Sequence, residues 1–228
     1  MDIKIPYTPR KHQSFLHNKI SKYRWSVLVC HRRFGKTVCM INHLIRSALL
    51  SKQKNPRYAY ISPTFKQSKS IAWDYMKQFT AKIPYTKFNE TELRVDLPNG
   101  ARITLLGAEN SDGLRGIYLD GCVIDEYANV HSKLFPEIIR PALSDRKGYC
   151  VFIGTPQGMN NNFYELYQHA QGADDWFNYK AKASETKIVD QDELVKAKEV
   201  MGDKKYQQEF ECDWIANIEG AIYNDVLV

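Results

Sequence analysis

One eight-residue segment, CHRRFGKT at positions 30–37, constrains the fold of this chain more than any other. It follows an apolar run at 25–29 and precedes a stretch whose apolar residues recur at helical spacing, so a strand turns into a helix here. Its last three letters match the end of the phosphate-binding loop written G-x-x-x-x-G-K-[ST], whereas Cys30 replaces the first glycine. The segment predicts a strand, a phosphate-binding loop and a helix in that order.

Each part of this loop has an expected role in binding ATP. Backbone N–H groups of the loop and of the following helix point at phosphate oxygens. Lys36 would reach the β- and γ-phosphates, and the hydroxyl of Thr37 would be a ligand of Mg²⁺. The alternative is a basic loop that contains Gly-Lys-Thr by chance. The other loop residues would surround the same phosphates: Cys30, His31, Arg32, Arg33, Phe34 and Gly35.

An acid pair ends a second apolar run, CVIDE at 122–126. Asp125 would close a buried parallel strand at the sheet edge where ligands bind, and would hold the magnesium ion directly or through water. Glu126 would polarise the water that attacks the γ-phosphate. The alternative is an ordinary Asp-Glu pair that opens the next loop.

The run FIGTPQG at 152–158 ends a third predicted strand. Thr155 would lie near the γ-phosphate, where its hydroxyl can detect whether that phosphate is present. Gly154 and Pro156 flank it and are common turn residues, so a plain exit from the strand is the alternative. The three motifs in this order favour a site that hydrolyses a nucleotide.

Strands alternate with helices between residues 25 and 183, which predicts a mostly parallel sheet flanked by helices. The Asn99-Gly100 dipeptide predicts an added β-hairpin, because it tolerates the positive φ angles of a tight turn. Strands are predicted at 26–30, 57–62, 92–97, 101–106, 121–125, 149–153 and 176–183. Helices are predicted at 37–51, 64–80 with Thr64 as its cap, 161–170, 192–201 and 203–211.

Composition narrows the class of protein. A chain of 228 residues with 43% hydrophobic residues is long enough for one α/β domain with a small appendage. The five cysteines form no C-x-x-C pair and no apolar run reaches 18 residues, so we expect a soluble protein of a reducing cytosol without a membrane partner. The net charge of +6 favours an anionic partner such as nucleic acid. Basic residues are dense in the first third, including Arg10, Lys11, Lys19, Lys22, Arg24, Arg32 and Arg33.

Taken together, these motifs resemble the ATPase domain of a tailed-phage terminase large subunit, the motor that packs DNA into procapsids. The matching stretches are the variant loop at 30–37, SPTFKQSK at 62–69, LRG at 114–116 ahead of VIDE, GTP at 154–156 and YQQEFECDW at 206–214. The resemblance implies a P-loop NTPase fold of the ASCE type, with an added β-hairpin and a small C-terminal lid region.

The resemblance also implies roles for single residues. Gln13 matches the position that recognises adenine, and Arg32 matches the arginine of the variant loop. Arg115 matches an arginine finger that reaches the nucleotide of a neighbouring subunit and stabilises charge on the transferred phosphoryl group. For each arginine the alternative is a solvated or phosphate-facing charge. Residues 154–156 match the coupling motif, which links hydrolysis to lid movement.

The domain plan follows from the same resemblance. Residues 1–228 would form the ATPase domain, with a core of about 1–160 plus the strand near 176–183, and a lid at about 184–220. The family's C-terminal nuclease domain is absent from this chain, so we expect no nuclease activity here. We expect the chain to be a truncated piece, because its last segment resembles a domain junction.

The implied cofactors are ATP and Mg²⁺, and the implied partners are double-stranded DNA, the portal protein and the small terminase subunit. The subunits would form a ring when docked on the procapsid, and the isolated domain can be monomeric. Such a motor works in the host cytoplasm, transiently at the portal, and is not part of the mature virion.

Two other functions share these motifs. A helicase-like DNA motor uses the same phosphate-loop chemistry and differs by displacing strands. A non-catalytic module would use ATP only to switch DNA binding or assembly. Glu126 argues against a pure switch, because such a protein has little use for a residue placed to activate water.

Overall fold

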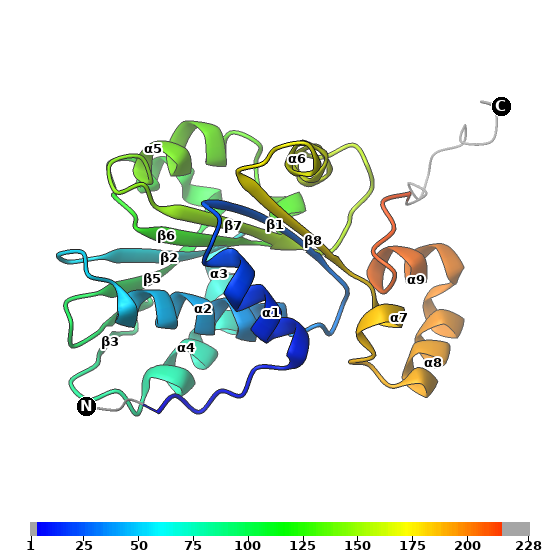
Figure 1. The fold of residues 1–228 in the computed structure, drawn as a ribbon, viewed down its shortest axis with the longest axis horizontal. Helices are drawn as coiled ribbons and strands as arrows, with labels where there is room; N and C mark the ends of the chain where they lie inside the picture. Colours follow the sequence, from blue (N-terminus) through cyan, green and yellow to red (C-terminus); the bar gives the residue numbers. More distant parts are fainter. Residues whose placement is uncertain (1–3, 216–228) are drawn as a thin grey trace.

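The computed structural model describes residues 4–215, and within them the chain forms one eight-stranded sheet with helices on both faces (Figure 1). The strand order is β3-β4-β5-β2-β6-β7-β1-β8. The strands are β1 (Trp25–Cys30), β2 (Arg57–Ser62), β3 (Lys87–Asn89), β4 (Arg94–Asp96), β5 (Arg102–Gly107), β6 (Gly121–Asp125), β7 (Tyr149–Gly154) and β8 (Trp176–Ala181).

All strand pairs from β5 across to β8 are parallel, as the sequence predicts. Strands β1 and β6 are buried along their whole length, because helices cover both of their faces. The longer helices are α1 (Lys11–Ile20), α2 (Lys36–Leu50), α4 (Trp73–Thr80), α6 (Asn162–Gln171), α8 (Gln191–Met201) and α9 (Asp203–Glu209). The short elements include α3 (Phe65–Gln67), η1 (Ser68–Ala72), η2 (Ala108–Leu114), η3 (Tyr127–Asn129), η4 (Leu134–Ile139), α5 (Arg140–Ala142) and α7 (Ala183–Thr186).

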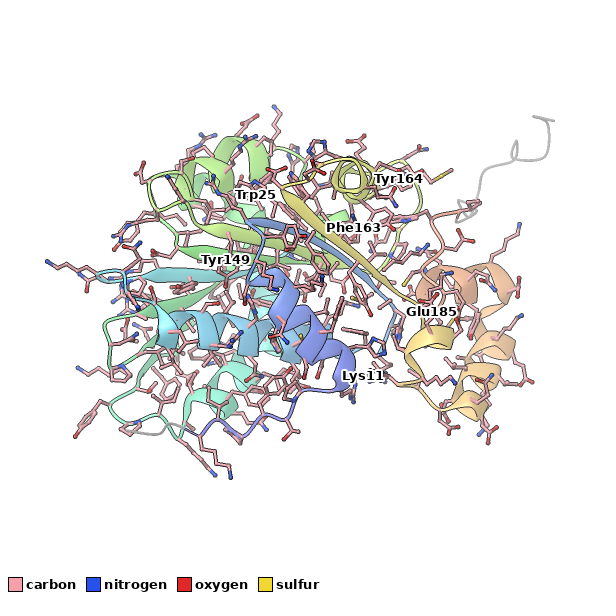
Figure 2. The ribbon with its side chains drawn as sticks, in the orientation of Figure 1. Lys11, Trp25, Tyr149, Phe163, Tyr164 and Glu185 are labelled. Atoms are coloured by element: carbon pink, nitrogen blue, oxygen red, sulfur yellow. The ribbon has the colours of Figure 1, made fainter. Side chains whose placement is uncertain are left out.

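Each face of the sheet has its own hydrophobic core. One core joins the sheet to α1, α2 and α4 through residues such as Leu16, Leu44 and Met76. The other joins it to η4 and α6, where Trp25 and Phe163 belong to the same buried cluster (Figure 2). The two cores hold the central strands rigidly from both sides, which fixes the sheet edge at which these strands end.

The helix predicted at 64–80 is present, but it contains a π-helical turn at η1. Its beginning agrees with the prediction, since the Thr64 hydroxyl accepts a hydrogen bond from the Gln67 N–H. Inside the π turn, the Ser68 hydroxyl donates to the Leu106 carbonyl at 2.8 Å. This tertiary bond ties the helix to β5, and periodicity along the chain does not predict it.

The predicted hairpin is confirmed, with β4 and β5 antiparallel, and a third strand, β3, extends it at the sheet edge. Only Gly100 of the turn dipeptide has a positive φ, 81°. Asn99 instead donates its amide to the Ala48 carbonyl at 2.9 Å, which caps the end of α2. The prediction of a positive φ angle is therefore confirmed for Gly100 and wrong for Asn99.

Helices α7, α8 and α9 pack around a small core of their own, centred on Ala183, Leu194 and Phe210. They lie beyond the carboxyl end of β8, on the right in Figure 1. Residues 216–228, which include the end of the predicted lid, lie outside the described residues. A search of the described residues found no helix with the length and apolar character needed to cross a bilayer.

A cluster of buried polar side chains lies between α1 and α2. The rings of His17 and His43 are stacked with their centres 5.5 Å apart, and the Tyr7 hydroxyl lies 3.0 Å from Nε2 of His17. Burial lowers the pKa of His17 to about 4 and that of His43 to about 3. Both rings are therefore neutral at neutral pH, and folding prevents them from binding protons.

We expect acid to destabilise the fold through these two rings. Their folded pKa values lie below the unfolded value near 6.5, so the stabilisation is complete above that pH and is lost as the pH falls toward 4. Between pH 7 and pH 5 each histidine should remove about 2 kcal/mol from the free energy of unfolding. Urea denaturation across pH measures this slope, which the His17→Gln/His43→Gln variant should flatten. An unchanged slope in that variant, or an equal effect from the exposed His131→Gln control, would contradict the assignment.

Candidate phosphate-binding site

The three sequence motifs meet at the carboxyl edge of the sheet. Strand β7 lies between β1 and β6, with Val29 opposite Gly154 and Asp125 opposite Ile153. Parallel pairing therefore brings the 30–37 loop, the acid pair and residues 154–156 to one place, although Lys36 and Gly154 lie 118 positions apart in the sequence.

The 30–37 loop turns sharply before α2, with positive φ at Arg33 (69°) and at Gly35 (88°). Gly35 is the N-cap of α2, so the helix begins directly after the loop, in the order of strand, loop and helix that the sequence predicts. A Cβ at Gly35 would lie 2.9 Å from Nε2 of Gln13, which donates a hydrogen bond to the Gly35 carbonyl at 3.3 Å. Helix α1 thus braces the loop from outside.

Gln13 is held in place by its own partners. Its Oε1 accepts hydrogen bonds from the Arg10 N–H at 3.0 Å and from the Tyr7 hydroxyl at 3.4 Å. The Arg10 guanidinium in turn donates to the Phe34 carbonyl at 3.3 Å. Gln13, to which the family resemblance assigns adenine recognition, therefore lies directly against the loop.

Lys36 connects all three motifs. Its ammonium donates to the Thr155 hydroxyl at 2.9 Å and lies 3.7 Å from a carboxylate oxygen of Glu126. The Thr155 hydroxyl donates to the Cys30 carbonyl at 3.3 Å. The Lys36 side chain is only 13% exposed, so this interaction is formed largely out of water.

Both carboxylate oxygens of Asp125 are engaged. One accepts a hydrogen bond from the Tyr60 hydroxyl, and the other accepts from the Glu126 N–H at 2.9 Å. Burial raises the pKa of Asp125, and the bond from Tyr60 opposes that rise. The Thr37 hydroxyl interacts with the same phenol and lowers its pKa, although burial dominates and raises it. Thr37, Tyr60 and Asp125 thus form one polar group.

Glu126 leaves the strand in a left-handed conformation, with φ 47° and ψ 48°. This backbone is uncommon for a residue other than glycine and indicates local strain at the site. Burial raises the pKa of Glu126, whereas nearby Lys36 lowers it. A carboxylate with a raised pKa is a stronger proton acceptor, which suits a residue that activates water.

The loop is also tied to the C-terminal helices. His31 is buried, and its Nε2 lies 2.8 Å from the Thr186 hydroxyl. The Arg32 N–H donates to the Glu209 carbonyl at 2.8 Å, and its 61% exposed guanidinium lies 3.8 Å from the Glu209 carboxylate. These contacts connect the loop to both α7 and α9.

The predicted coupling segment contacts the same helices. The Gln208 amide donates to the Pro156 carbonyl at 2.6 Å, and Gln208 is buried. Helix α9 therefore contacts both the phosphate loop, through Glu209, and the 154–156 segment, through Gln208. Movement of α9 has to change or break these two contacts.

Arg115 lies elsewhere. It follows η2, is 57% exposed, and its guanidinium lies 3.9 Å from the Glu137 carboxylate of η4. It lines a surface depression with Pro141 and Asp145. The structure thus brings together the other predicted site residues, and it places Arg115 on the surface beside η4 and α5.

Sequence reasoning missed four residues of this site: Tyr60, Thr186, Gln208 and Glu209. The sequence could have indicated Tyr60, because a tyrosine in a buried strand needs a hydrogen-bond partner for its hydroxyl. It could not identify Asp125 as that partner, because this depends on β2 lying beside β6. Gln208 and Glu209 belong to the 206–214 stretch that carries the resemblance, but nothing local assigns them or Thr186 to this site, since their contacts arise only from the docking of α7 and α9.

A family model described as "Terminase large subunit, T4likevirus-type, N-terminal" matches residues 29–225. The large terminase subunit of Thermus phage G20c is 42% identical over 60 residues, which make up 26% of this chain and 12% of that protein. The match thus covers a small part of that relative's length.

Solved structures share the fold. The large terminase ATPase domain of Thermus phage P74-26 has a TM-score of 0.77 at 21% identity, covering 92% of this chain and 96% of that one. The large terminase of a thermophilic bacteriophage, solved in complex with ATP-γ-S, has a TM-score of 0.73 at 14% identity, covering 90% of this chain and 52% of that one. This chain therefore spans about half of that second protein.

Gly35→Ala should destabilise the protein more than Gly158→Ala. Both glycines have positive φ, 88° and 80°, so alanine costs roughly 1–2 kcal/mol at either position. At Gly35 the new Cβ also displaces the Gln13 amide, whereas at Gly158 it meets nothing within 4 Å. Urea denaturation measures both losses. Equal losses would show that α1 does not brace the loop.

Proposed function

Because the family model covers residues 29–225, the chain belongs to the family of terminase large subunit N-terminal domains, and we propose that it is an ATP-hydrolysing DNA-packaging motor domain. In this proposal hydrolysis of ATP is coupled to translocation of double-stranded DNA into a procapsid. The observation that carries the proposal is the Lys36 ammonium, held between Thr155 and Glu126 at the start of α2. The neighbour solved in complex with ATP-γ-S supports nucleotide binding by this fold.

The proposed reaction uses the side chains gathered at the sheet edge. Lys36 exchanges its contact with Thr155 for the β- and γ-phosphate oxygens, and the N–H groups at the start of α2 bind the same phosphates. Glu126 accepts a proton from the attacking water, a role that suits its raised pKa. Gln13, beside Gly35, contacts the adenine, and Arg32 at the loop surface stabilises charge on the phosphates.

The oxygens of Thr37 and Asp125 fit Mg²⁺, which prefers oxygen ligands and keeps several of its waters. Both Asp125 oxygens already accept hydrogen bonds, from Tyr60 and Glu126, so Asp125 fits a contact made through water. When bound, the ion neutralises charge on the β- and γ-phosphates. Tyr60 fixes the orientation of the Asp125 carboxylate, and Lys36 keeps its negative charge compensated.

Residues 154–156 serve as the coupling segment in this proposal. Loss of the γ-phosphate changes the partners of Thr155, and the adjacent Pro156 carbonyl is bonded to Gln208 of α9. Helices α7–α9 act as the lid, because they also hold His31 and Arg32 of the loop. Hydrolysis is thereby linked to lid position through short, direct contacts.

The proposed partners are those of a packaging machine: double-stranded DNA, the portal protein and the small terminase subunit. The domain works as a ring of identical subunits docked on the procapsid in the host cytoplasm. Arg115 is the residue proposed to reach the neighbouring nucleotide, since its half-exposed guanidinium lies on the surface.

Lys36→Ala and Glu126→Gln should each lower the ATP hydrolysis rate at least about 100-fold, with or without DNA. The first removes the phosphate-binding cation, and the second removes the proton acceptor while keeping its shape. Phosphate release measures both, and Lys66→Ala, an exposed lysine of α3, is the matched control. Undiminished hydrolysis in both variants would contradict the site. A burst of one phosphate per wild-type subunit without turnover would instead favour a nucleotide switch.

Mixing Arg115→Ala with Glu126→Gln subunits should restore part of the ATPase activity that each lacks alone. A finger in trans lets an intact Arg115 of one subunit serve an intact Glu126 of its neighbour, and such fingers contribute about 10³ to 10⁵ in rate. Steady-state hydrolysis across mixing ratios measures the rescue, with light scattering confirming assembly. Assembled mixtures without rescue would contradict a role for Arg115 in trans and favour Arg32 acting within its own subunit.

A further inference from the structure

A basic surface lies at the other end of the sheet, at the amino ends of the parallel strands. A cavity of about 490 Å³ opens there between the α1–β1 turn, the last turns of α2 and the start of β7. Four cationic residues line it: Lys22, Arg24, Arg46 and Lys147. We call these four residues the amino-edge cluster. In Figure 1 this end lies opposite the lid helices.

The charge of the amino-edge cluster is poorly compensated. The cavity lining includes one carboxylate, Asp120, whose side chain is 6% exposed. One of its oxygens accepts a hydrogen bond from the Arg57 N–H at 2.7 Å, and the other has no hydrogen-bond partner and lies 3.9 Å from the Arg146 guanidinium. Among the side chains that the structure describes, no carboxylate lies within 4.0 Å of a cationic nitrogen of the cluster.

Apart from Arg24, the fold makes little use of these charges. The end of α2 is capped by others, because Asn99 donates to the Ala48 carbonyl and Tyr58 to the Ser47 carbonyl. Arg24 has structural contacts, because it donates to the Gly148 carbonyl at 3.0 Å and to the Leu143 carbonyl at 3.3 Å and lies 4.6 Å from the centre of the Trp25 ring. Arg46 makes one long bond, 3.4 Å, to the Ser21 hydroxyl. Arg46, Lys22 and Lys147 are exposed, so their cationic groups are accessible to a ligand.

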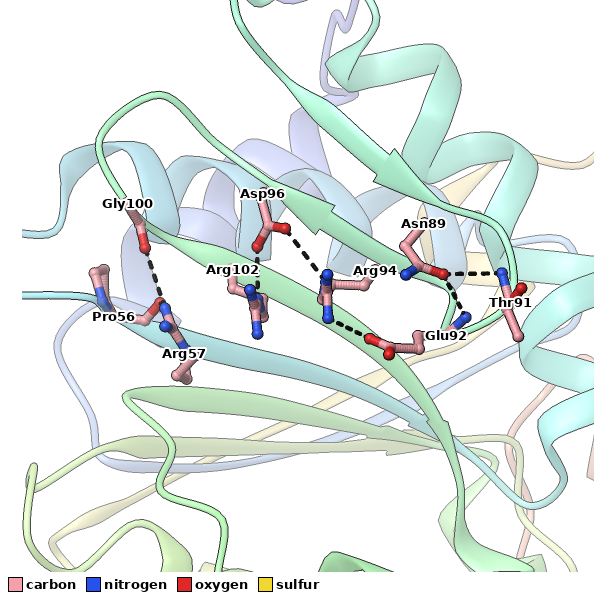
Figure 3. A network of polar contacts seen from close by, with 9 residues as sticks. All are labelled: Pro56, Arg57, Asn89, Thr91, Glu92, Arg94, Asp96, Gly100 and Arg102. Atoms are coloured by element: carbon pink, nitrogen blue, oxygen red, sulfur yellow. Dashed lines mark hydrogen bonds and ion pairs between the residues drawn. The ribbon is translucent and has the colours of Figure 1, made fainter.

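The arginines of the β-hairpin differ in this respect. Arg94 pairs with Glu92 and Asp96, and Arg102 pairs with Asp96 at 2.6 Å (Figure 3). Their charges are largely neutralised within the chain, so they have little attraction left for an external anion. The basic residues of this chain therefore differ in the fold. The hairpin arginines are paired with carboxylates, whereas the side chains of the amino-edge cluster are not.

The basic surface extends beyond the cavity, because further arginines lie next to it. Beyond the cavity, Arg146 donates to the Lys54 carbonyl, and the Arg146 and Arg57 guanidinium groups lie 4.8 Å and 5.9 Å from the Tyr118 ring. Cations thus continue from the cavity toward the amino end of β2. A row of cations matches a ligand with repeated phosphates better than a single phosphate ion.

The polar character of the surface also favours nucleic acid over protein. Hydroxyls of Ser21, Tyr23 and Ser47 line the cavity beside the cations, and such groups donate to phosphate oxygens. Leu50 is the large apolar residue of this lining that is clearly exposed, at 67%. A protein interface of ordinary affinity needs a larger apolar centre than this.

We propose that the amino-edge cluster binds the phosphate backbone of double-stranded DNA, at the end of the domain opposite the phosphate loop. The inference rests on the proposed function and names the surface through which the motor domain holds its substrate. Contacts to phosphates without base contacts give binding that is nearly independent of sequence, as a packaging motor requires. The rigid sheet, packed on both faces, then lies between the lid helices and the DNA.

The test is duplex binding by the 228-residue chain across a salt series, measured by fluorescence anisotropy with two duplexes of unrelated sequence. The variant is Lys22→Gln/Arg46→Gln/Lys147→Gln. The control is Lys82→Gln/Lys87→Gln/Lys133→Gln, which removes the same charge from exposed lysines outside the cluster, the phosphate-binding site and the lid helices. ATP hydrolysis without DNA is measured on every sample, and circular dichroism checks folding.

We expect the slope of log K against log salt to become shallower by about 2.7 in the cluster variant, because each phosphate contact contributes about 0.9. The control should keep the wild-type slope, both duplexes should behave alike, and ATP hydrolysis without DNA should not change. An unchanged slope in the cluster variant, or an equal change in the control, overturns the assignment and leaves the surface to a protein partner. If the DNA-binding assignment fails but the wild-type chain hydrolyses ATP, the proposed function still stands. If the wild-type chain does not hydrolyse ATP, the proposed function is overturned, whatever the DNA-binding result.

Discussion

The candidate site is organised around one ammonium group, that of Lys36. Lys36 lies at the start of α2, and its Nζ contacts Thr155 after β7 and Glu126 after β6. These contacts exist because β1, β7 and β6 are adjacent and parallel, so their carboxyl ends share one edge. Two hydrophobic cores hold this arrangement from both faces, and α1 supports the loop through Gln13. The fold thus concentrates a largely buried cation and two carboxylates where a triphosphate can bind.

Much of this arrangement could be predicted from the sequence, because the decisive signals are local. Gly35, Lys36 and Thr37 follow an apolar strand, Asp125 ends another, and Thr155 ends a third. Parallel α/β topology then brings strand ends together without further information. The same reasoning correctly identified the hairpin around Gly100, since its turn needs a positive φ there.

What could not be predicted depends on neighbours in space. The Tyr60–Asp125 hydrogen bond requires β2 beside β6, a strand order that periodicity does not reveal. The contacts of Gln208 and Glu209 require the docking of α9 onto the loop. Net charge predicted an anionic partner, but only the folded chain separates the neutralised arginines of the hairpin from the cations of the amino-edge cluster. Nucleotide chemistry and DNA binding are then assigned to opposite ends of one rigid sheet.

The most direct test is a crystal structure of this chain with Mg²⁺ and a non-hydrolysable ATP analogue. The account predicts that the γ-phosphate lies against Lys36, with Thr155 and Glu126 within hydrogen-bonding reach of that phosphate or of the water beside it. It also predicts the metal between Thr37 and the water shell of Asp125. An analogue bound away from the 30–37 loop, or Lys36 still bonded to Thr155 beside an empty loop, would contradict the account.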